Sequence, residues 1–336
     1  MGCALTTSGG VRCWGNNERG QLGDGTTTVR YAPVDVLDLN SGVSAVKTNG
    51  LHTCAIVWGG LVKCWGYNAT GELGDGTTTT RLAPVAVTGL GSGVVAIAVG
   101  AKHSCAVTSS GGVKCWGDNS IYQLHDGTSV ARPTPVDVAG LPSGVVDITA
   151  GAGGTCALMT NGGVKCWGYS FCGRNVDCMM LRTSPGDVSG LVSSVGALES
   201  RIDGEIFRIA QTCGLVNGGV VCWGDEFRGL VAGTDGAFTS SKGPFFRFAR
   251  GFDYSCALTG TGGVKCAGSN FYGELGNGSV SVGQAGWDAA ASRVLSDVTG
   301  LTRGVIAISA SGSSTCALTS VGRIFCWGTS THSGVY

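Results

Sequence analysis

One phrase returns seven times along the chain and constrains the fold more than any other feature. At Cys156 it reads CALMTNGGVKCWG, with two cysteines ten residues apart followed by Trp-Gly. The first four copies begin 51 residues apart, and the later spacings range from 43 to 60 residues. A recurring unit of this size is typical of solenoids and propellers. The copies occupy residues 3–15, 54–66, 105–117, 156–168, 213–224, 256–268 and 316–328.

Each copy predicts a β-hairpin. Pairing Cys3 with Cys13 sets Leu5 opposite Val11 and leaves Thr7-Ser8-Gly9 as a three-residue loop. Such a loop requires a left-handed residue at its third position, which Gly supplies without steric cost. The fifth copy is one residue shorter, and the same pairing leaves Asn217-Gly218, a preferred two-residue loop. The other glycines predicted at the left-handed position are Gly60, Gly111, Gly162, Gly262 and Gly322.

A second set of phrases separates the hairpins. GQLGDGT, PVDV and SGVSAV follow the first hairpin, and related phrases follow the next two. Short β-branched runs bounded by Gly and Pro indicate strands, and no segment has a convincing helical period. Three or four short strands in each unit of about 50 residues are typical of a propeller blade. We therefore predict an all-β fold, a single seven-bladed β-propeller domain over residues 1–336 built from tandem repeats of about 51 residues.

The cycle of GxLGDGT, PVxV, IAxG and CALxxxGxVxCWG resembles the regulator of chromosome condensation repeat over essentially the whole chain. The resemblance implies a seven-bladed propeller that acts as a binding scaffold. Known members of that family include an exchange factor for a nuclear GTPase, a plant ultraviolet photoreceptor and a secreted bacterial inhibitor of β-lactamases. Six tryptophans share one repeat position, so we interpret them as packing residues rather than as a light-sensing cluster. They are Trp14, Trp65, Trp116, Trp167, Trp223 and Trp327.

Fourteen of the 16 cysteines bracket hairpins, and the other two share one insertion. Opposed residues of an antiparallel pair lie about 4.5–5.5 Å apart at Cα, within the range that a disulfide spans. We predict cross-strand disulfides, with buried free cysteines and zinc ligands as the alternatives. Disulfide-dense chains belong to oxidising compartments, so we expect an extracellular, cell-surface or periplasmic protein. The cysteines concerned are Cys3, Cys13, Cys54, Cys64, Cys105, Cys115, Cys156, Cys166, Cys172, Cys178, Cys213, Cys222, Cys256, Cys266, Cys316 and Cys326.

The two ends of the sequence lead us to expect a fragment of a longer exported chain. The first hairpin lacks the IAxG phrase that precedes the others, and the last lacks the GDGT and PVxV phrases that should follow. No export signal precedes Cys3.

Charge and motif content exclude several classes of function. The chain has 22 basic and 22 acidic side chains without a basic patch, so we expect no nucleic-acid partner. No apolar run approaches the roughly 18 residues of a membrane span. The sequence has neither GxSxG nor HExxH, and His52 and His103 share one repeat position. We therefore expect no catalytic residue, cofactor or metal, and we interpret the single Asp of each GDGT phrase as a turn residue rather than a calcium ligand.

Aromatic residues gather in the irregular fifth and sixth repeats. Eight of the ten Phe lie between Phe207 and Phe271. Large aromatic side chains on irregular loops are common at protein interfaces, although they also fill the core of an irregular blade. The candidate partner-binding residues in this stretch and in the insertion before it are Tyr169, Phe171, Phe227, Phe238, Phe245 and Phe246.

These features together predict an exported binding scaffold that presents inter-blade loops to a protein partner, with inhibition as one form of that role. Two alternatives belong to other classes of function. An enzyme with its site on one propeller face would need converging carboxylates or histidines around the ring axis. An exchange-factor-like role would be favoured by a cytosolic location with free thiols.

The predicted pairing can be tested directly. Peptide mapping of the protein from an oxidising compartment, without reduction, should yield linked peptides for Cys3–Cys13 and Cys213–Cys222, because these cysteines are opposed in register. Thiol labelling of the same sample is the control. Free thiols throughout would contradict both the pairing and the argument for export.

Overall fold

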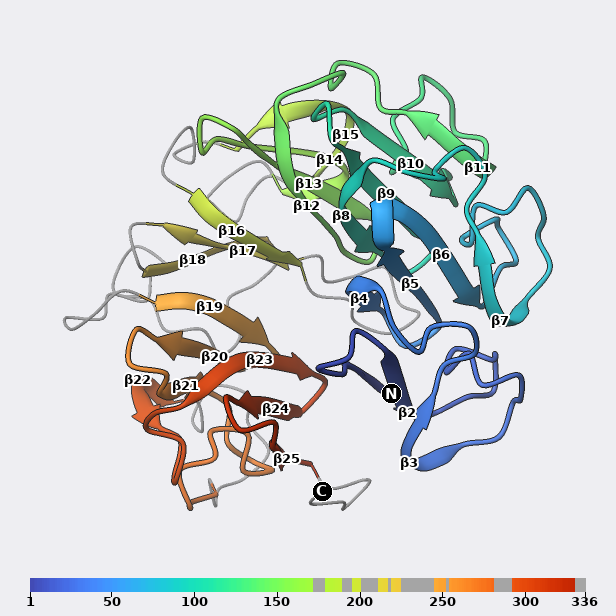
Figure 1. The fold of residues 1–336 in the computed structure, drawn as a ribbon. Helices are drawn as coiled ribbons and strands as arrows, with labels where there is room; N and C mark the ends of the chain where they lie inside the picture. The colour runs from blue at the N-terminus through green and yellow to red at the C-terminus, as the bar shows by residue number, and fades with distance from the viewer. Residues whose placement is uncertain are drawn as a thin grey trace.

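The structure is a computed structural model that describes residues 1–171, 179–188, 195–200, 211–216, 219–224, 245–251, 254–280 and 292–329. These residues form seven antiparallel sheets around a central axis (Figure 1), which we number 1 to 7 in chain order. The described part of the chain contains one 3-10 turn, Trp58–Gly60, and no α-helix. No helix there is long and apolar enough to cross a membrane.

Each sheet contains one of the predicted hairpins. Cys3 lies opposite Cys13 and Leu5 opposite Val11, as predicted. Gly9 is left-handed with φ 77°, and so are the five glycines predicted to match it. The loop Asn217-Gly218 lies outside the described residues, but the pair that flanks it, Val216 and Gly219, has the predicted register. The hairpin strands are β1 (Gly2–Leu5) and β2 (Val11–Gly15), β5 (His52–Val57) and β6 (Leu61–Gly66), β9 (His103–Thr108) and β10 (Val113–Gly117), β13 (Gly154–Met159) and β14 (Val164–Phe171), β17 (Gln211–Val216) and β18 (Gly219–Gly224), β20 (Tyr254–Thr259) and β21 (Val264–Gly268), and β24 (Ser314–Thr319) and β25 (Ile324–Gly328).

Further strands flank the hairpins on both sides. Six sheets begin with an innermost strand, which lies nearest the axis in Figure 1. Five sheets end with an outermost strand on the other side of the hairpin. The innermost strands are β4 (Val43–Thr48), β8 (Val94–Val99), β12 (Val145–Ala150), β16 (Val195–Ser200), β19 (Phe245–Arg250) and β23 (Val305–Ser311). The outermost strands are β3 (Arg30–Asp35), β7 (Arg81–Ala86), β11 (Arg132–Asp137), β15 (Met179–Asp187) and β22 (Ser292–Asp297).

The all-β propeller is confirmed, but the predicted seven-bladed ring is not confirmed. Within the described residues, sheets 2, 3, 4 and 6 have four strands. The described strands of sheet 1 are its hairpin and an outermost strand, and those of sheets 5 and 7 are an innermost strand and the hairpin. The regular four-stranded unit is therefore seen in four of the sheets that the structure describes.

Disulfides close the hairpins. Six join opposed cysteines ten residues apart, which confirms the predicted pairing in sheets 1 to 4, 6 and 7. In sheet 5, Cys213 lies opposite Cys222 in the same register. Cys172 and Cys178 lie outside the described residues. No described cysteine is free, so the cysteines of the six bonded hairpins are neither buried free thiols nor zinc ligands.

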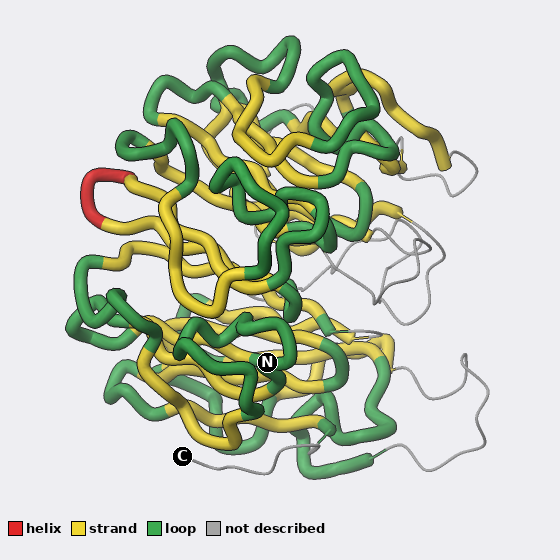
Figure 2. The backbone as a smooth tube through the Cα atoms, turned by 90° about the vertical axis from the view of Figure 1, so that its right-hand side faces the viewer, coloured by secondary structure: helices red, strands yellow, loops and turns green. Residues whose placement is uncertain are grey.

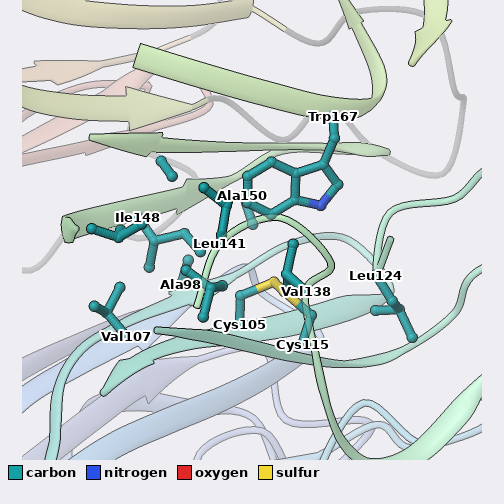
Figure 3. Packing of buried hydrophobic residues seen from close by; sticks show 13 residues of the cluster. Ala98, Cys105, Val107, Cys115, Leu124, Val138, Leu141, Ile148, Ala150 and Trp167 are labelled. Carbon is teal, nitrogen blue, oxygen red and sulfur yellow. A yellow bond between two sulfur atoms is a disulfide. The ribbon is translucent and has the colours of Figure 1, made fainter. Parts of the chain in front are cut away.

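Neighbouring sheets pack through their faces. One buried cluster joins the Cys105–Cys115 disulfide of sheet 3 with Ile148 and Trp167 of sheet 4 (Figure 3). Corresponding clusters join sheet 1 to sheet 2, sheet 2 to sheet 3 and sheet 6 to sheet 7. The hydrophobic core thus lies between the sheets, and the disulfides of sheets 1, 2, 3, 4 and 6 form part of an interface.

A tryptophan hydrogen bond fixes each regular interface. The indole nitrogen of Trp116 donates to the backbone oxygen of Glu72, in the preceding sheet, at 2.8 Å. The ring lies so close to Gly74 that a Cβ there would come within 2.8 Å of the indole nitrogen. The GDG phrase therefore begins with Gly because the next sheet's tryptophan occupies that space. Trp65 with Gln21, Trp167 with Gln123 and Trp327 with Glu274 repeat the bond.

We expect Trp116→Ala to lower the free energy of unfolding by about 3–5 kcal/mol, because it empties a fully buried site and removes this hydrogen bond. Trp14→Ala is the matched control, since Trp14 holds the same repeat position but is only half-buried. Trp14→Ala should lower the free energy of unfolding by about 2 kcal/mol or less. Urea denaturation of both variants measures the difference, and equal costs would contradict the assigned role of the tryptophans.

Candidate binding surfaces

The GDGT loops of sheets 1 to 3 are closed by their own side chains. Asp24 Oδ1 accepts hydrogen bonds from the backbone N–H and the hydroxyl of Thr26, at 3.0 and 2.7 Å. Its Oδ2 accepts from Arg30 Nε at 2.7 Å, and Asn17 Nδ2 donates to Oδ1 at 3.0 Å. This confirms the predicted turn role, and the sequence analysis missed the arginine. Asp75 with Thr77 and Arg81, and Asp126 with Thr128 and Arg132, repeat the arrangement.

The side chains of each loop engage both oxygens of these carboxylates. Burial alone would raise the pKa of Asp24, but the hydrogen bonds from Thr26 and Arg30 outweigh burial and lower that pKa. Among the described residues, no three His, Cys, Asp or Glu side chains lie close enough together to hold a metal ion.

His52 and His103 link neighbouring sheets. His52 Nε2 lies 2.9 Å from the Ser104 hydroxyl, and His103 Nε2 lies 2.9 Å from the Thr155 hydroxyl. Both rings are fully buried. Burial, with a smaller contribution from His103, lowers the pKa of His52 to about 3, and burial lowers the pKa of His103 to about 4. The two histidines therefore stay neutral and hold the interface together.

A group of charged residues on the innermost strands was not visible in the sequence. Burial raises the pKa of Glu199, on β16, to about 7, against the opposing influence of Lys47 on β4 and Arg250 on β19. Burial also raises the pKa of Asp147 on β12, and Lys47 again opposes it. A carboxyl group with a pKa near neutrality is suited to proton transfer. Among the described residues, the charged groups that act on Glu199 are the cations Lys47 and Arg250.

The structure places the predicted partner-binding residues in different environments. Phe245 is buried, with 2 % of its surface exposed, and belongs to a cluster with Phe248 and Cys213. It is therefore a core residue, and its assignment to the binding surface was wrong. Phe227 and Phe238 lie outside the described residues. The backbones of Tyr169 and Phe171 lie on β14, paired with Leu181 and Met179, and that of Phe246 lies on β19.

The propeller has two chemically different ends. The hairpin-tip end consists of the turns between paired hairpin strands and the linkers that enter the innermost strands: residues 6–10, 36–42, 58–60, 87–93, 109–112, 138–144, 160–163, 260–263, 298–304 and 320–323. The 3-10 turn Trp58–Gly60, red in Figure 2, projects there. The loop end consists of the GDGT-type loops, residues 16–29, 67–80, 118–131 and 269–280.

Models of the Regulator of chromosome condensation (RCC1) repeat match much of this chain. One matches residues 8–56, 60–107 and 110–158, and a second matches residues 94–123, 145–174 and 305–333. Together they cover more than half of the sequence. The chain belongs to the RCC1 repeat family. The hairpins, GDGT loops and strand phrases within these matched ranges are thus parts of RCC1 repeats.

Curated RCC1 relatives match part of the chain. Human E3 ubiquitin-protein ligase HERC2 is 37% identical over 140 residues, which cover 41% of this chain and 3% of that protein. The Ultraviolet-B receptor UVR8 of Arabidopsis thaliana is 30% identical over 174 residues, 51% of this chain and 40% of the receptor. The chain thus spans less than half the length of either relative.

Solved structures share the fold over almost the whole chain. Prp20p from Saccharomyces cerevisiae, studied for its binding to Gsp1p and histones, aligns with a TM-score of 0.77 at 19% identity, over 97% of this chain and 82% of Prp20p. The ectodomain of the Physcomitrella patens receptor kinase CR4 aligns with a TM-score of 0.56 at 19% identity, over 97% of this chain and 70% of that chain. At these identities the likeness concerns the fold alone.

The buried histidines predict a loss of stability in acid. Between pH 7.5 and pH 5, each should lower the free energy of unfolding by about 2 kcal/mol, because the unfolded chain takes up protons near pH 6.5 and the folded rings do not. Above pH 7.5 neither contributes to the pH dependence. Urea denaturation across this range should give a flatter profile for His52→Gln/His103→Gln than for the parent. His125→Asn, in a loop, is the control, and an unchanged profile in the double variant would rule out the histidines as the cause.

Proposed function

We propose that this RCC1 propeller is an exported scaffold that binds a protein partner through loops at its surface, with inhibition of that partner as one outcome. The observation that carries the proposal is the series of six cross-strand disulfides, one in each of six described hairpins. Disulfides at this density persist in extracellular, cell-surface and periplasmic environments. They also hold the strands rigid, which lets loops meet a partner without a large loss of conformational entropy.

Specific binding is assigned to residues 169–187 and 225–247. The GDGT loops of sheets 1 to 3 share the same hydrogen bonds, so they offer nearly identical surfaces that discriminate poorly between partners. Sheet 4 departs from this regularity because β14 and β15 run past the usual strand end, pairing Phe171 with Met179. The aromatic residues of this region that remain candidates are Tyr169, Phe171, Phe227, Phe238 and Phe246.

An alanine scan tests this assignment once a partner has been purified. We expect Phe171→Ala and Phe246→Ala to weaken binding tenfold or more, since a few aromatic residues usually dominate an interface. Val130→Ala, in a regular loop of sheet 3, is the control and should have little effect. Isothermal titration calorimetry measures the affinities. If the losses are confined to loops of sheets 1 to 3, the assignment is wrong.

Localisation is tested separately with the full-length gene product. Fractionation of the native cells should recover the protein outside the cytoplasm with its hairpin cysteines unreactive toward a thiol reagent. A cytosolic protein with reactive thiols would overturn the export part of the proposal and favour an exchange-factor-like role.

A further inference from the structure

Asparagine is followed directly by glycine at four places in the chain. Asn49-Gly50, Asn161-Gly162 and Asn277-Gly278 lie within the described residues, and Asn217-Gly218 lies outside them. In such a pair the backbone nitrogen of Gly can attack the side-chain amide carbon, Cγ, of Asn, because Gly has no Cβ to hinder the approach. The reaction converts Asn into an acidic residue. The three described pairs can therefore be compared as sites of self-modification.

The three pairs differ in whether the attacking nitrogen is already engaged. Gly162 N donates to Met159 O at 2.9 Å, within the hairpin turn of sheet 4. Gly50 N donates to Thr48 Oγ1 at 3.2 Å. Gly278 N has no acceptor within hydrogen-bond distance in the part of the chain that the structure describes. An amide nitrogen must leave its acceptor before it can attack a carbon, so of the three nitrogens that of Gly278 is the one ready to react.

The place of Gly278 in the fold explains why its nitrogen is free. Gly278 belongs to the loop of sheet 6 that corresponds to the GDGT loops of sheets 1 to 3. In sheets 1 and 2 the equivalent nitrogens, those of Gly25 and Gly76, donate to the outermost strand of the following sheet. Their acceptors are Leu82 O at 3.0 Å and Pro133 O at 2.9 Å. The described strands of sheet 7 include no outermost strand, so none of them supplies this acceptor to Gly278.

The side chain of Asn277 is held with its carbonyl oxygen against donors. Ser279 N donates to Asn277 Oδ1 at 3.1 Å and Ser279 Oγ donates to it at 2.7 Å, with Asn270 Nδ2 as a third donor at 3.4 Å. Attack on Cγ places negative charge on Oδ1, and donors already aimed at that oxygen stabilise the charge. Asn161 Oδ1 accepts one hydrogen bond within the described residues, from Gly163 N at 2.9 Å. The Asn277 amide is therefore the better prepared of the two.

Asn49 has a different obstacle. Its Oδ1 also accepts two hydrogen bonds, from Leu51 N at 2.7 Å and His52 N at 3.0 Å. Its Nδ2, which has to leave, donates to Gly100 O in sheet 3. Asn277 Nδ2 donates to no acceptor among the described residues, and the exposure of its loop lets water reach the site. Departure of the amide nitrogen thus breaks a bond between sheets at Asn49 and none at Asn277.

We propose that Asn277 of the folded protein converts itself into an aspartyl residue through a cyclic imide with Gly278, with water as the co-reactant. The bond from Gly278 N to Asn277 Cγ forms and the bond from Cγ to Nδ2 breaks. Nδ2 leaves as ammonia and takes up the proton that Gly278 N gives up. Water then opens the ring: cleavage of the Cγ–N bond gives aspartate, and cleavage of the backbone C–N bond gives isoaspartate. This inference is independent of the proposed scaffold function.

The aspartate product has the side chain that the regular loops encode. Sheets 1 to 3 have Asp24, Asp75 and Asp126 at the position of Asn277. Each of those carboxylates pairs with an arginine six residues later, and the corresponding residue in sheet 6 is Gly283. The conversion therefore adds a negative charge to the loop end that no arginine at that position offsets. The isoaspartate product also lengthens the backbone of the loop by one carbon.

Peptide mapping by mass spectrometry, on protein kept folded at mildly alkaline pH, tests the proposal. We expect Asn277 to deamidate about fivefold or more faster than Asn161 and Asn49, because the glycine nitrogen at each of those sites must first lose a hydrogen bond. In the same protein unfolded in urea, the three sites should react at similar rates, since each has the same Asn-Gly sequence. Equal rates in the folded protein, or no conversion of Asn277, would overturn the proposal.

Two variants of one exposed residue test the part played by the donors. Ser279→Ala removes the hydroxyl that donates to Asn277 Oδ1, and we expect it to slow the conversion about threefold or more. Ser279→Thr is the matched control, because it keeps a hydroxyl and reproduces the residue that sheets 1 to 3 have at this position, so it should react like the parent. Thermal unfolding checks that both variants keep the fold. A parental rate in Ser279→Ala would overturn the assigned mechanism.

Discussion

The contact between a tryptophan and the glycine-bearing loop of the preceding sheet determines how this propeller is assembled. Trp65, Trp116 and Trp167 each cross an interface, donate to a backbone oxygen of the loop beyond it and are completely buried. A four-stranded sheet cannot bury both faces alone, so each repeat is stable only against its neighbours. The indole lies in the buried interface and also restricts the first position of the preceding sheet's GDGT loop to Gly. The spacing between the sheets and the shape of the GDGT loops therefore both depend on this tryptophan contact.

Sequence reasoning succeeded where local residues decide the backbone. The hairpin register depends on a cysteine pair and a left-handed glycine within one short segment, and both were predicted correctly. The sequence analysis failed for Phe245, which was placed on the surface because its repeat is irregular. Alignment with Val94 and Val145, the first buried residues of their strands, would have identified it as a core residue.

Other features could not be predicted because they depend on distant parts of the chain. Lys47 in sheet 2 acts electrostatically on Glu199 in sheet 5. No local feature of either strand indicates that these two residues influence each other. Six innermost strands share a β-bulge, such as the one at Val95 in β8. These bulges could not be predicted from the sequence for a different reason. Val94–Val99 is a continuous apolar run, and a run of that kind gives no sign of which residue loses its partner. Six equivalent strands share the shift, so it belongs to the repeat and not to one irregular sheet.

The short span of each disulfide has a consequence for how the chain matures. The described bonds all join cysteines ten residues apart, whereas the nearest cysteine of the following repeat, Cys54 after Cys13, is about four times more distant along the chain. Closing that longer loop would cost about 1 kcal/mol more in entropy, so native pairs form preferentially even before the sheets assemble. In hairpins other than the fourth, where Cys172 lies six residues after Cys166, each pair can therefore close within its own hairpin. Such pairing is local, in contrast to that of domains whose cysteines pair across the whole fold.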